Sequence, residues 1–297
     1  MNNQLKPSAF VGYTNFDLTI NLDNNENIND RITVDNIFRN LGGMAANTAC
    51  FSSFLGNNSF IFSSIGKDGI SNLILEEFEK YSVDTSYLIQ TKKSFTNICI
   101  ILVDLQGERK IISEPFSFQY NKLLSFVEKN SDINIIHFDG YRLIDCDTII
   151  NIKNQFKFKM SIDLDGAEFT NDNIQKLKYF DYIFMNKRTL TELTSEIKLE
   201  YALNKLNFLN DQHIIVTLSD KGAIYFFNKE SKFAQSKKFN TIDSTGAGDA
   251  FAGSFLYGLS LGLPVYENLE KSCLVAGQST TFNGSTKFLY KIKNPFS

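Results

Sequence analysis

The hydrophobic pattern alternates between two kinds of segment along most of the chain. Short continuous apolar runs are typical of strands buried in a parallel sheet, and the stretches between them place apolar residues at helical spacing. Their alternation predicts βαβ units and a mainly parallel sheet. The expected core strands are Ala9–Gly12, Ser59–Ser63, Ile133–Phe138, Lys159–Asp163, Tyr182–Met185 and His213–Leu218. The expected helices are Ala45–Leu55, Ser71–Tyr81, Tyr120–Lys129, Asp145–Phe156, Asn171–Lys178, Thr189–Ser195, Glu200–Asn207, Gly248–Leu261 and Val265–Phe282.

Two segments, 17–38 and 94–113, alternate in polarity but show no helical pattern. In the second segment, Cys99 and Ile101 fall on one face of an extended chain, and Ile98 and Ile100 fall on the other. A strand that is apolar on both faces lies deep in a core or covers something. We therefore expect the two segments to form a small antiparallel sheet over the main sheet, which we call the lid. Two ordinary edge strands are the alternative.

Length and charge limit the fold and the partners. The chain of 297 residues has few prolines and no Ser- or Gly-rich linker, so we expect residues 1–297 to form a single domain, although the length alone also suits two. The formal net charge of −3 provides no field for binding nucleic acid. No run of about 18 apolar residues could span a membrane, and Met1–Pro7 has no apolar signal core. These features predict a cytoplasmic protein whose ligands are small molecules.

Cysteine and histidine are too scarce for several common kinds of site. The four cysteines are far apart and form no CxxC motif, so we expect reduced, mostly buried thiols. The two histidines leave little material for a zinc site or a Ser–His triad. The phosphate loop G-x-x-x-x-G-K-[ST] is absent, and so is G-x-G-x-x-G after the first strand.

A glycine-rich turn at Gly246, Ala247 and Gly248 enters a helix near the C-terminus. Free backbone N–H groups and the helix dipole at such a start attract anions, even in an acidic protein. Asp249 follows in the first helical turn. It could stabilise the helix start as a capping carboxylate, or it could accept a proton from a substrate hydroxyl during phosphoryl transfer. The residues alone leave both interpretations open.

The segment Asp243–Phe251, with the sequence D-S-T-G-A-G-D-A-F, resembles the C-terminal signature D-T-x-G-A-G-D of the ribokinase/PfkB family of carbohydrate and nucleoside kinases. Only the serine at position 244 departs from it. The resemblance implies that Asp249 is the catalytic base and that the backbone of Gly246–Gly248 forms the anion hole for the transferred phosphate. Asp243 and Thr245 match positions that hold a monovalent cation such as K⁺ in some ribokinases. Support of the glycine turn is an equal alternative for both residues.

Motifs in the N-terminal half resemble the same family. Leu41–Ala49 resembles G-G-x-x-x-N-x-A, and Gly12–Asp17 resembles G-x-x-N-x-D. Carboxylate and amide groups suit hydroxyl ligands because they form several hydrogen bonds. The resemblance implies an acceptor site for sugar hydroxyls. Asp139 follows a strand, and it belongs to this site if its carboxylate reaches the substrate rather than water. The acceptor-site residues are Asn15, Asp17, Gly42, Gly43, Asn47 and Asp139.

The resemblance also implies a nucleotide site, with departures from the family pattern. Thr189 stands where the family has the glutamate of N-x-x-E, which helps to organise magnesium. Ser219 replaces the usual glycine of the nucleotide loop, and Asp163–Gly166 lacks the arginine of the motif D-x-N-x-R. The nucleotide-binding residues implied are Asn186, Thr217, Ser219 and Gly222.

These motifs predict a ribokinase-like three-layer α/β/α fold of Rossmann-like type with a β-sheet lid. The expected activity is ATP-dependent phosphorylation of a primary hydroxyl of a small sugar, with Mg²⁺ and in some members K⁺ as cofactors. The apolar lid face would suit a homodimer. A nucleoside kinase is the first alternative, favoured if Phe16, Phe38 or Phe95 stacks on a base. A sugar-binding regulator without turnover is the second, and Thr189 keeps it open.

Overall fold

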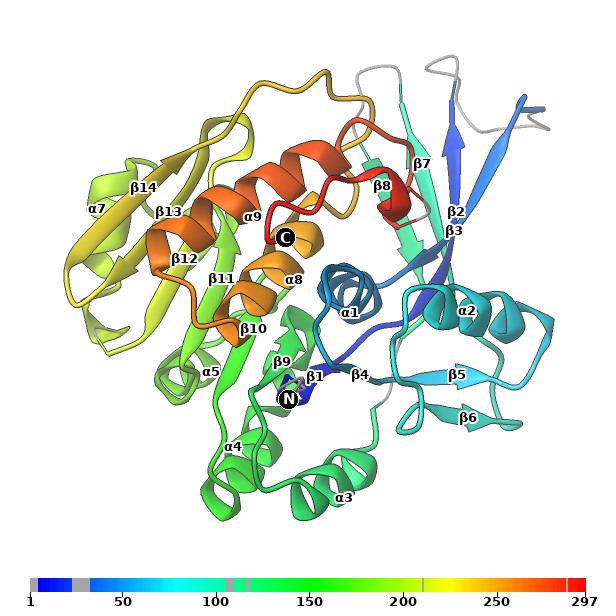
Figure 1. Cartoon of the computed structure of the whole chain (residues 1–297), viewed down its shortest axis with the longest axis horizontal. Helices are drawn as coiled ribbons and strands as arrows, with labels where there is room; N and C mark the ends of the chain where they lie inside the picture. The colour runs from blue at the N-terminus through cyan, green and yellow to red at the C-terminus, as the bar shows by residue number, and fades with distance from the viewer. Residues whose placement is uncertain (1–4, 23–32, 105–108, 116–117, 210, 287) are drawn as a thin grey trace.

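An eight-stranded sheet lies at the centre of the computed structural model, which describes residues 5–22, 33–104, 109–115, 118–209, 211–286 and 288–297. Its strand order is β14-β13-β12-β11-β10-β9-β1-β4 (Figure 1). The six strands from β12 to β4 in this order are parallel. They confirm the predicted α/β fold and differ from the expected bounds by at most two residues. These strands are β1 (Ser8–Val11), β4 (Ser59–Phe62), β9 (Ile135–Asp139), β10 (Met160–Asp163), β11 (Tyr182–Asn186) and β12 (His213–Thr217).

One edge of this sheet is a hairpin that the sequence pattern did not predict. Strands β13 (Gly222–Phe227) and β14 (Glu230–Gln235) pair antiparallel with each other, and β13 pairs antiparallel with β12. The connecting residues Asn228 and Lys229 both have positive φ, at 49° and 66°. A two-residue hairpin of this kind is usually signalled by Asn-Gly. Lysine at the second position removed that signal.

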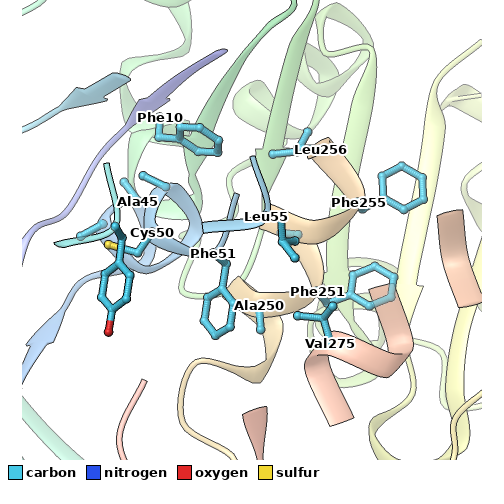
Figure 2. Close-up of a cluster of buried hydrophobic side chains, with 14 of the residues drawn as sticks. Phe10, Ala45, Cys50, Phe51, Leu55, Ala250, Phe251, Phe255, Leu256 and Val275 are labelled. Atoms are coloured by element: carbon cyan, nitrogen blue, oxygen red, sulfur yellow. The ribbon is translucent and has the colours of Figure 1, made fainter. Parts of the chain in front are cut away.

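Helices cover both faces of the sheet, so alternate side chains of β1 enter different cores. Phe10 belongs to the core that includes residues of α1, α2, α8 and α9, whereas Ala9 and Val11 belong to the core that includes residues of α3, α4, α6 and α7. Figure 2 shows Phe10 in the first core with Phe51 of α1 and Phe255 of α8. No helix in the described ranges is long and apolar enough to cross a membrane. The helices are α1 (Met44–Leu55), α2 (Gly69–Lys80), α3 (Asn121–Lys129), α4 (Cys146–Gln155), α5 (Asn171–Lys176), α6 (Lys187–Thr194), α7 (Leu199–Lys205), α8 (Ala247–Ser260) and α9 (Val265–Ser279).

Helices α1 and α8 approach each other closely in this core. A Cβ atom at Gly253 of α8 would lie 2.6 Å from the carbonyl oxygen of Thr48 in α1, so only glycine allows this separation. Each helix begins after a glycine with positive φ, at 94° for Gly43 and 74° for Gly246. Glycine adopts this left-handed region without the steric cost that a Cβ imposes. Both predicted glycine turns therefore start helices that pack side by side.

The lid is a separate sheet with the order β3-β2-β7-β8, visible beside the main sheet in Figure 1. Its strands are β2 (Asn15–Asn21), β3 (Ile37–Gly42), β7 (Ile98–Val103) and β8 (Arg109–Ser113). The outer pairs are antiparallel, but β2 and β7 are parallel, so the expectation of a wholly antiparallel sheet is wrong for the central pair. Residues 23–32 and 105–108 of the two predicted segments lie outside the described residues.

Asp68 ties the base of the lid to the main body. Its carboxylate caps α2 by accepting a bond from the Ser71 N–H group (2.9 Å). The same carboxylate accepts bonds from the backbone N–H (2.7 Å) and hydroxyl (2.9 Å) of Thr96, just before β7. Nearby, a short parallel pair joins β5 (Ser64–Gly66) and β6 (Ile89–Thr91). One side chain therefore positions both a helix and the entry to a lid strand.

Candidate active site

The two glycine turns meet at the first turns of α1 and α8. Asn47 in α1 donates a hydrogen bond from Nδ2 to Oδ2 of Asp249 in α8, at 2.8 Å. Both side chains are buried. The residues lie 202 positions apart in the sequence, so only the tertiary fold brings them together. This contact joins the predicted acceptor motif to the predicted phosphate motif.

Open space lies beside the glycine turn before α8. A Cβ atom at Gly248 would meet no atom within 4 Å, so packing does not require glycine there. By contrast, a Cβ at Gly246 would lie 2.9 Å from Cβ of Ser285. The N–H of Ala247 donates a bond to the carbonyl oxygen of Ser244 (3.2 Å), and the other N–H groups at the start of a helix have no intrahelical partners. The helix start therefore has open space at Gly248, where an anion can approach the backbone.

Asp249 lies in this first turn with a perturbed carboxyl group. Burial raises its pKa well above the ordinary value, and the charges of Asp163, Asp165 and Asp139 raise it further. The hydrogen bond from Asn47 acts in the opposite direction. Among the described residues, Asn47 is the hydrogen-bond partner of the Asp249 carboxylate, and no side chain caps α8. The arrangement favours a proton acceptor over a helix cap.

Asp17, a predicted acceptor-site residue, lies on lid strand β2. A Cβ atom at Gly42 would lie 2.0 Å from Asp17 Oδ2, so glycine at this corner makes room for the carboxyl group. Gly43 is equally constrained, because a Cβ there would lie 2.4 Å from the carbonyl oxygen of Tyr13. Burial raises the pKa of Asp17 to about 7. Both glycines of the motif therefore serve close packing around a buried carboxyl group.

Buried polar atoms without partners gather around this corner. Leaving such an atom without a hydrogen bond costs roughly 1–3 kcal/mol, so each one needs an explanation. They come from the loop before β2, from β2 itself, from α1 and from the residue before β7. Within the described chain, the atoms with no hydrogen-bond partner here are Thr14 Oγ1, Asn15 Oδ1, Asp17 Oδ1, Asn47 Oδ1 and Asn97 Nδ2. A bound ligand with hydroxyl groups is one source of such partners.

Asp139 supports the loop that carries these groups. Its Oδ2 accepts a bond from the backbone N–H of Tyr13 (2.5 Å), and its Oδ1 lies 3.8 Å from Nε of Arg142. A Cβ atom at Gly12 would lie 2.0 Å from the Asp139 carboxylate. Burial raises the pKa of Asp139 to about 6, although the bond from Tyr13 and the charge of Arg142 both act to lower it. These contacts position the β1–β2 loop, and a direct contact between Asp139 and the acceptor stays a prediction.

Asp243 and Thr245 stabilise the turn before α8. Oδ1 of Asp243 accepts bonds from the backbone N–H (2.9 Å) and the hydroxyl (2.6 Å) of Thr245. Oδ2 of Asp243 accepts a bond from the N–H of Gly284 (3.0 Å). These bonds fit the turn-support interpretation and join the glycine turn to the C-terminal segment. A cation at this position stays a prediction.

The predicted nucleotide residues gather at the carboxyl ends of two neighbouring strands. Asn186 ends β11 in register with Thr217, which ends β12. Asn186 caps α6 by accepting a bond from the N–H of Thr189 (2.8 Å). Ser219 has a φ of 56°, which explains why glycine is usual at this position of the family loop. A Cβ at Gly222 would lie 2.0 Å from the carbonyl oxygen of Ala234, so glycine is needed there for packing.

Two acidic residues near Asp249 were not predicted as site residues. Asp163 ends β10 in register with Asp139, and Asp165 follows in the next loop. Burial, together with the charges of Asp165 and Asp139, raises the pKa of Asp163 to about 7. Their position after a core strand was an available signal, since the carboxyl ends of parallel strands share one edge. In the described part of the chain, no group of three or more acidic, histidine or cysteine side chains could hold a metal ion.

No carboxylate next to position 189 takes the place of the family glutamate in the described structure. Thr189 is buried in the first turn of α6. Glu192, the nearest carboxylate along the chain, is half exposed and forms an ion pair with Arg188 at 2.9 Å. Magnesium often keeps several water ligands and is bound through substrate phosphates. The described residues therefore suit a magnesium ion held mainly by the nucleotide and water.

Comparison with known proteins gives one consistent result. A sequence profile described as pfkB family carbohydrate kinase matches residues 6–291. A ribokinase of Dictyostelium discoideum is 25% identical over 305 residues, covering 93% of this chain and 94% of the relative. A nucleoside kinase of Methanocaldococcus jannaschii is 25% identical over 291 residues, covering 95% and 91%. The structure of Arabidopsis thaliana ribokinase complexed with ribose and ATP superposes with a TM-score of 0.82 at 19% identity, covering 99% of this chain and 100% of that one.

Proposed function

The chain belongs to the pfkB family of carbohydrate kinases, and on this premise we propose that it transfers the terminal phosphoryl group of ATP to a primary hydroxyl of a small sugar. Family membership makes it a phosphotransferase. The observation that carries the finer proposal is the bond between Asn47 and Asp249. It places a buried carboxyl group between an open glycine turn and a set of unpaired polar atoms.

Asp249 is the proposed proton acceptor. The attacking hydroxyl oxygen forms the new bond to phosphorus, the bond to the departing ADP oxygen breaks, and the hydroxyl proton moves to the Asp249 carboxylate. A raised pKa supports this role because it makes the carboxylate a stronger base than an exposed aspartate. The backbone N–H groups at Gly246–Gly248 offset the charge on the transferred group.

The acceptor lies, in this proposal, against Asn15, Asp17 and Asn47, with Gly42 and Gly43 providing the space. The unpaired atoms at this corner support a polyhydroxylated ligand. ATP occupies the loops after β11 and β12, where Asn186 and Thr217 end neighbouring strands. Magnesium bound with ATP would supply positive charge to the phosphates. Residues that hold K⁺ would be Asp243 and Thr245.

A nucleoside acceptor is the second candidate, and one observation favours it. Tyr13 and Tyr141 form a ring pair with centroids 4.7 Å apart beside the acceptor corner, and Tyr141 is 44% exposed. A planar base can stack on such a surface. The lid phenylalanines give less support, because Phe16 is buried in the core and Phe95 is 83% exposed. Nothing in the family match favours a regulator without turnover.

Two further proposals concern assembly and location. Ile111 and Ile112 of lid strand β8 are 63% and 58% exposed, which supports pairing of two copies through the lid. A cytoplasmic location stays a prediction from the cysteine pattern, and the four cysteines are free and buried in the structure.

An ATP-consumption screen tests the proposed function. Purified protein is mixed with ATP, magnesium and one acceptor at a time from a panel of sugars and nucleosides, and ADP release is measured. We expect release with at least one free sugar and little release without an acceptor. Release with nucleosides alone would replace the sugar by the second candidate. If the protein is folded and none of the acceptors in the panel causes ADP release, phosphoryl transfer to this class of compound is refuted.

A further inference from the structure

Asn97 lies just before lid strand β7, outside every motif that the family resemblance covers. Its carbonyl oxygen accepts a bond from the backbone N–H of Phe16 (2.9 Å). The parallel register pairs Phe16 with Ile98 and Asp17 with Cys99. Continued by one residue, this register sets Asn97 beside Asn15. A lid segment with no assigned role therefore adjoins the acceptor site.

The side chain of Asn97 lies on the same face as the acceptor residues. Side chains two positions apart on a strand share one face, so Asn15 goes with Asp17 and Asn97 goes with Cys99. Residues in register on adjacent strands point to the same side of a sheet. The pKa of Cys99 is raised by burial and further by the charge of Asp17, which agrees with this placement. Asn97 and Asn15 therefore both face the acceptor corner.

The unpaired atoms of the two amides are complementary. Nδ2 of Asn97 is a buried donor and Oδ1 of Asn15 is a buried acceptor, and neither has a hydrogen-bond partner within the described chain. A ligand hydroxyl group can accept a bond from the first and donate a bond to the second. A carbonyl or phosphate oxygen can only accept, and an ammonium group can only donate. Among the groups of a small-molecule ligand, a hydroxyl can therefore satisfy both atoms at once, as a water molecule can in the unliganded site.

We propose that Asn97 is a specificity-determining residue of the acceptor site, where it and Asn15 together hold one hydroxyl of the acceptor. This inference rests on the proposed function and extends it. The hydroxyl is a further one, distinct from the hydroxyl that is phosphorylated at Asp249. An acceptor without it leaves two buried amide atoms unpaired, which disfavours binding. The lid thereby selects polyols by a hydroxyl remote from the reacting one.

The first test replaces Asn97 by leucine, which has a similar shape and no hydrogen-bonding group. Loss of one neutral hydrogen bond predicts a rise of about 3- to 10-fold in the KM for the acceptor. The KM for ATP should stay unchanged, since Asn97 lies on the acceptor side. Asn97→Asp replaces the donor by an acceptor beside Asn15 and should raise the acceptor KM further. Asn21→Leu, the same change at an exposed position of β2, is the matched control and should change neither constant.

Thermal unfolding separates this role from a structural one. Asn97→Leu removes a buried donor that has no partner in the described chain, so the Tm of the unliganded protein should stay the same or rise. The rise in Tm that a saturating acceptor produces in the wild type should become smaller in the variant. An asparagine that merely supported the fold would give a lower unliganded Tm and an unchanged ligand-induced rise. That pattern would overturn the proposal.

Deoxy acceptors identify the hydroxyl. Each acceptor in a series lacks one hydroxyl of the best substrate found in the screen. For one member, the wild type and Asn97→Leu should have the same KM, because the interaction is already lost. An equal ratio between variant and wild type for every member would refute the proposal. If a sugar raises the Tm of the wild type but is not phosphorylated, only the proposed phosphoryl transfer is refuted. The ligand-induced Tm shift then still tests the role of Asn97. No Tm rise with any sugar or nucleoside would overturn both.

Discussion

Replacing Asp249 by asparagine should separate its chemistry from its structural contact. The side chain keeps its shape, and the introduced amide oxygen can still accept the bond that Asn47 donates at 2.8 Å in the wild type. What disappears is the ability to take up the hydroxyl proton. Positioned general bases contribute about 10²- to 10⁴-fold to rate, so we expect kcat to fall within this range. Acceptor and ATP affinities should change little.

The stability of this variant has an expected sign. Burial raises the pKa of Asp249, so the ionised carboxylate destabilises the fold at neutral pH. Asp249→Asn removes that charge, and its Tm at pH 7 should equal or exceed that of the wild type. A loss of activity accompanied by this Tm cannot be attributed to unfolding. Differential scanning calorimetry on both proteins provides the measurement.

The pH dependence supplies an independent measurement. In the wild type, kcat/KM should fall as the pH drops through the pKa of Asp249, because only the ionised form accepts a proton. Since that pKa is raised, the fall should begin at a higher pH than for an exposed aspartate. The variant should lack this limb of the profile. If it retains more than about half of the wild-type turnover, the reasoning is refuted and Asp249 is not the proton acceptor.

Other substitutions test the remaining parts of the site. Asp17→Ala should weaken sugar binding about 10- to 150-fold through loss of a charge-assisted bond and leave ATP binding unchanged; equal losses for both ligands in calorimetric titrations would make Asp17 structural. Thr189→Glu adds a carboxylate near the proposed nucleotide site and should lower the free magnesium needed for half-maximal rate; superimposable titration curves would exclude position 189 from metal binding. Asp163 has a folded-state pKa of about 7, above about 3.9 in the unfolded chain. Its contribution to the free energy of unfolding is therefore lost as the pH rises from about 4 to about 7. Asp163→Asn should make this decline shallower in urea unfolding measured across that interval, and parallel curves would contradict the assignment.

Local sequence patterns predicted the elements better than their partners. Gly43 and Gly246 indicated two helix starts because glycine turns are visible in the sequence. The bond between Asn47 and Asp249 depends on packing between helices far apart in the chain, which no local pattern contains. Alternation likewise indicated strand β7 without showing that it runs parallel to β2. Whether two neighbouring strands are parallel or antiparallel depends on the path of the chain between them. The periodicity of side chains within one strand does not reveal that path.

The features that were missed have equally specific causes. Lys229 adopts a positive φ that glycine would have signalled, so the hairpin of β13 and β14 was hidden. The segment with Asp163 and Asp165 drew attention because it lacks the arginine of the family motif. The position of the two carboxylates at the shared carboxyl edge of the sheet was the signal that mattered. Asn97 belongs to no motif, and only its unpaired amide in the folded chain distinguishes it. Such groups become visible when burial and hydrogen bonding are known.

The close contact at Gly253 bears on how such a kinase acquires new substrates. Because α8 packs directly on α1 there, Asp249 and the glycine turn before α8 keep a fixed distance from Asn47. Asp17 and Asn97, by contrast, belong to the lid and its entry. Under the roles proposed above, evolution can exchange side chains in the lid and recruit another acceptor while the helix pair preserves the position of Asp249. Turnover and substrate preference become separately inherited traits, and a chimera that carries a relative's lid strands on this helix pair would adopt the relative's preference at this protein's rate.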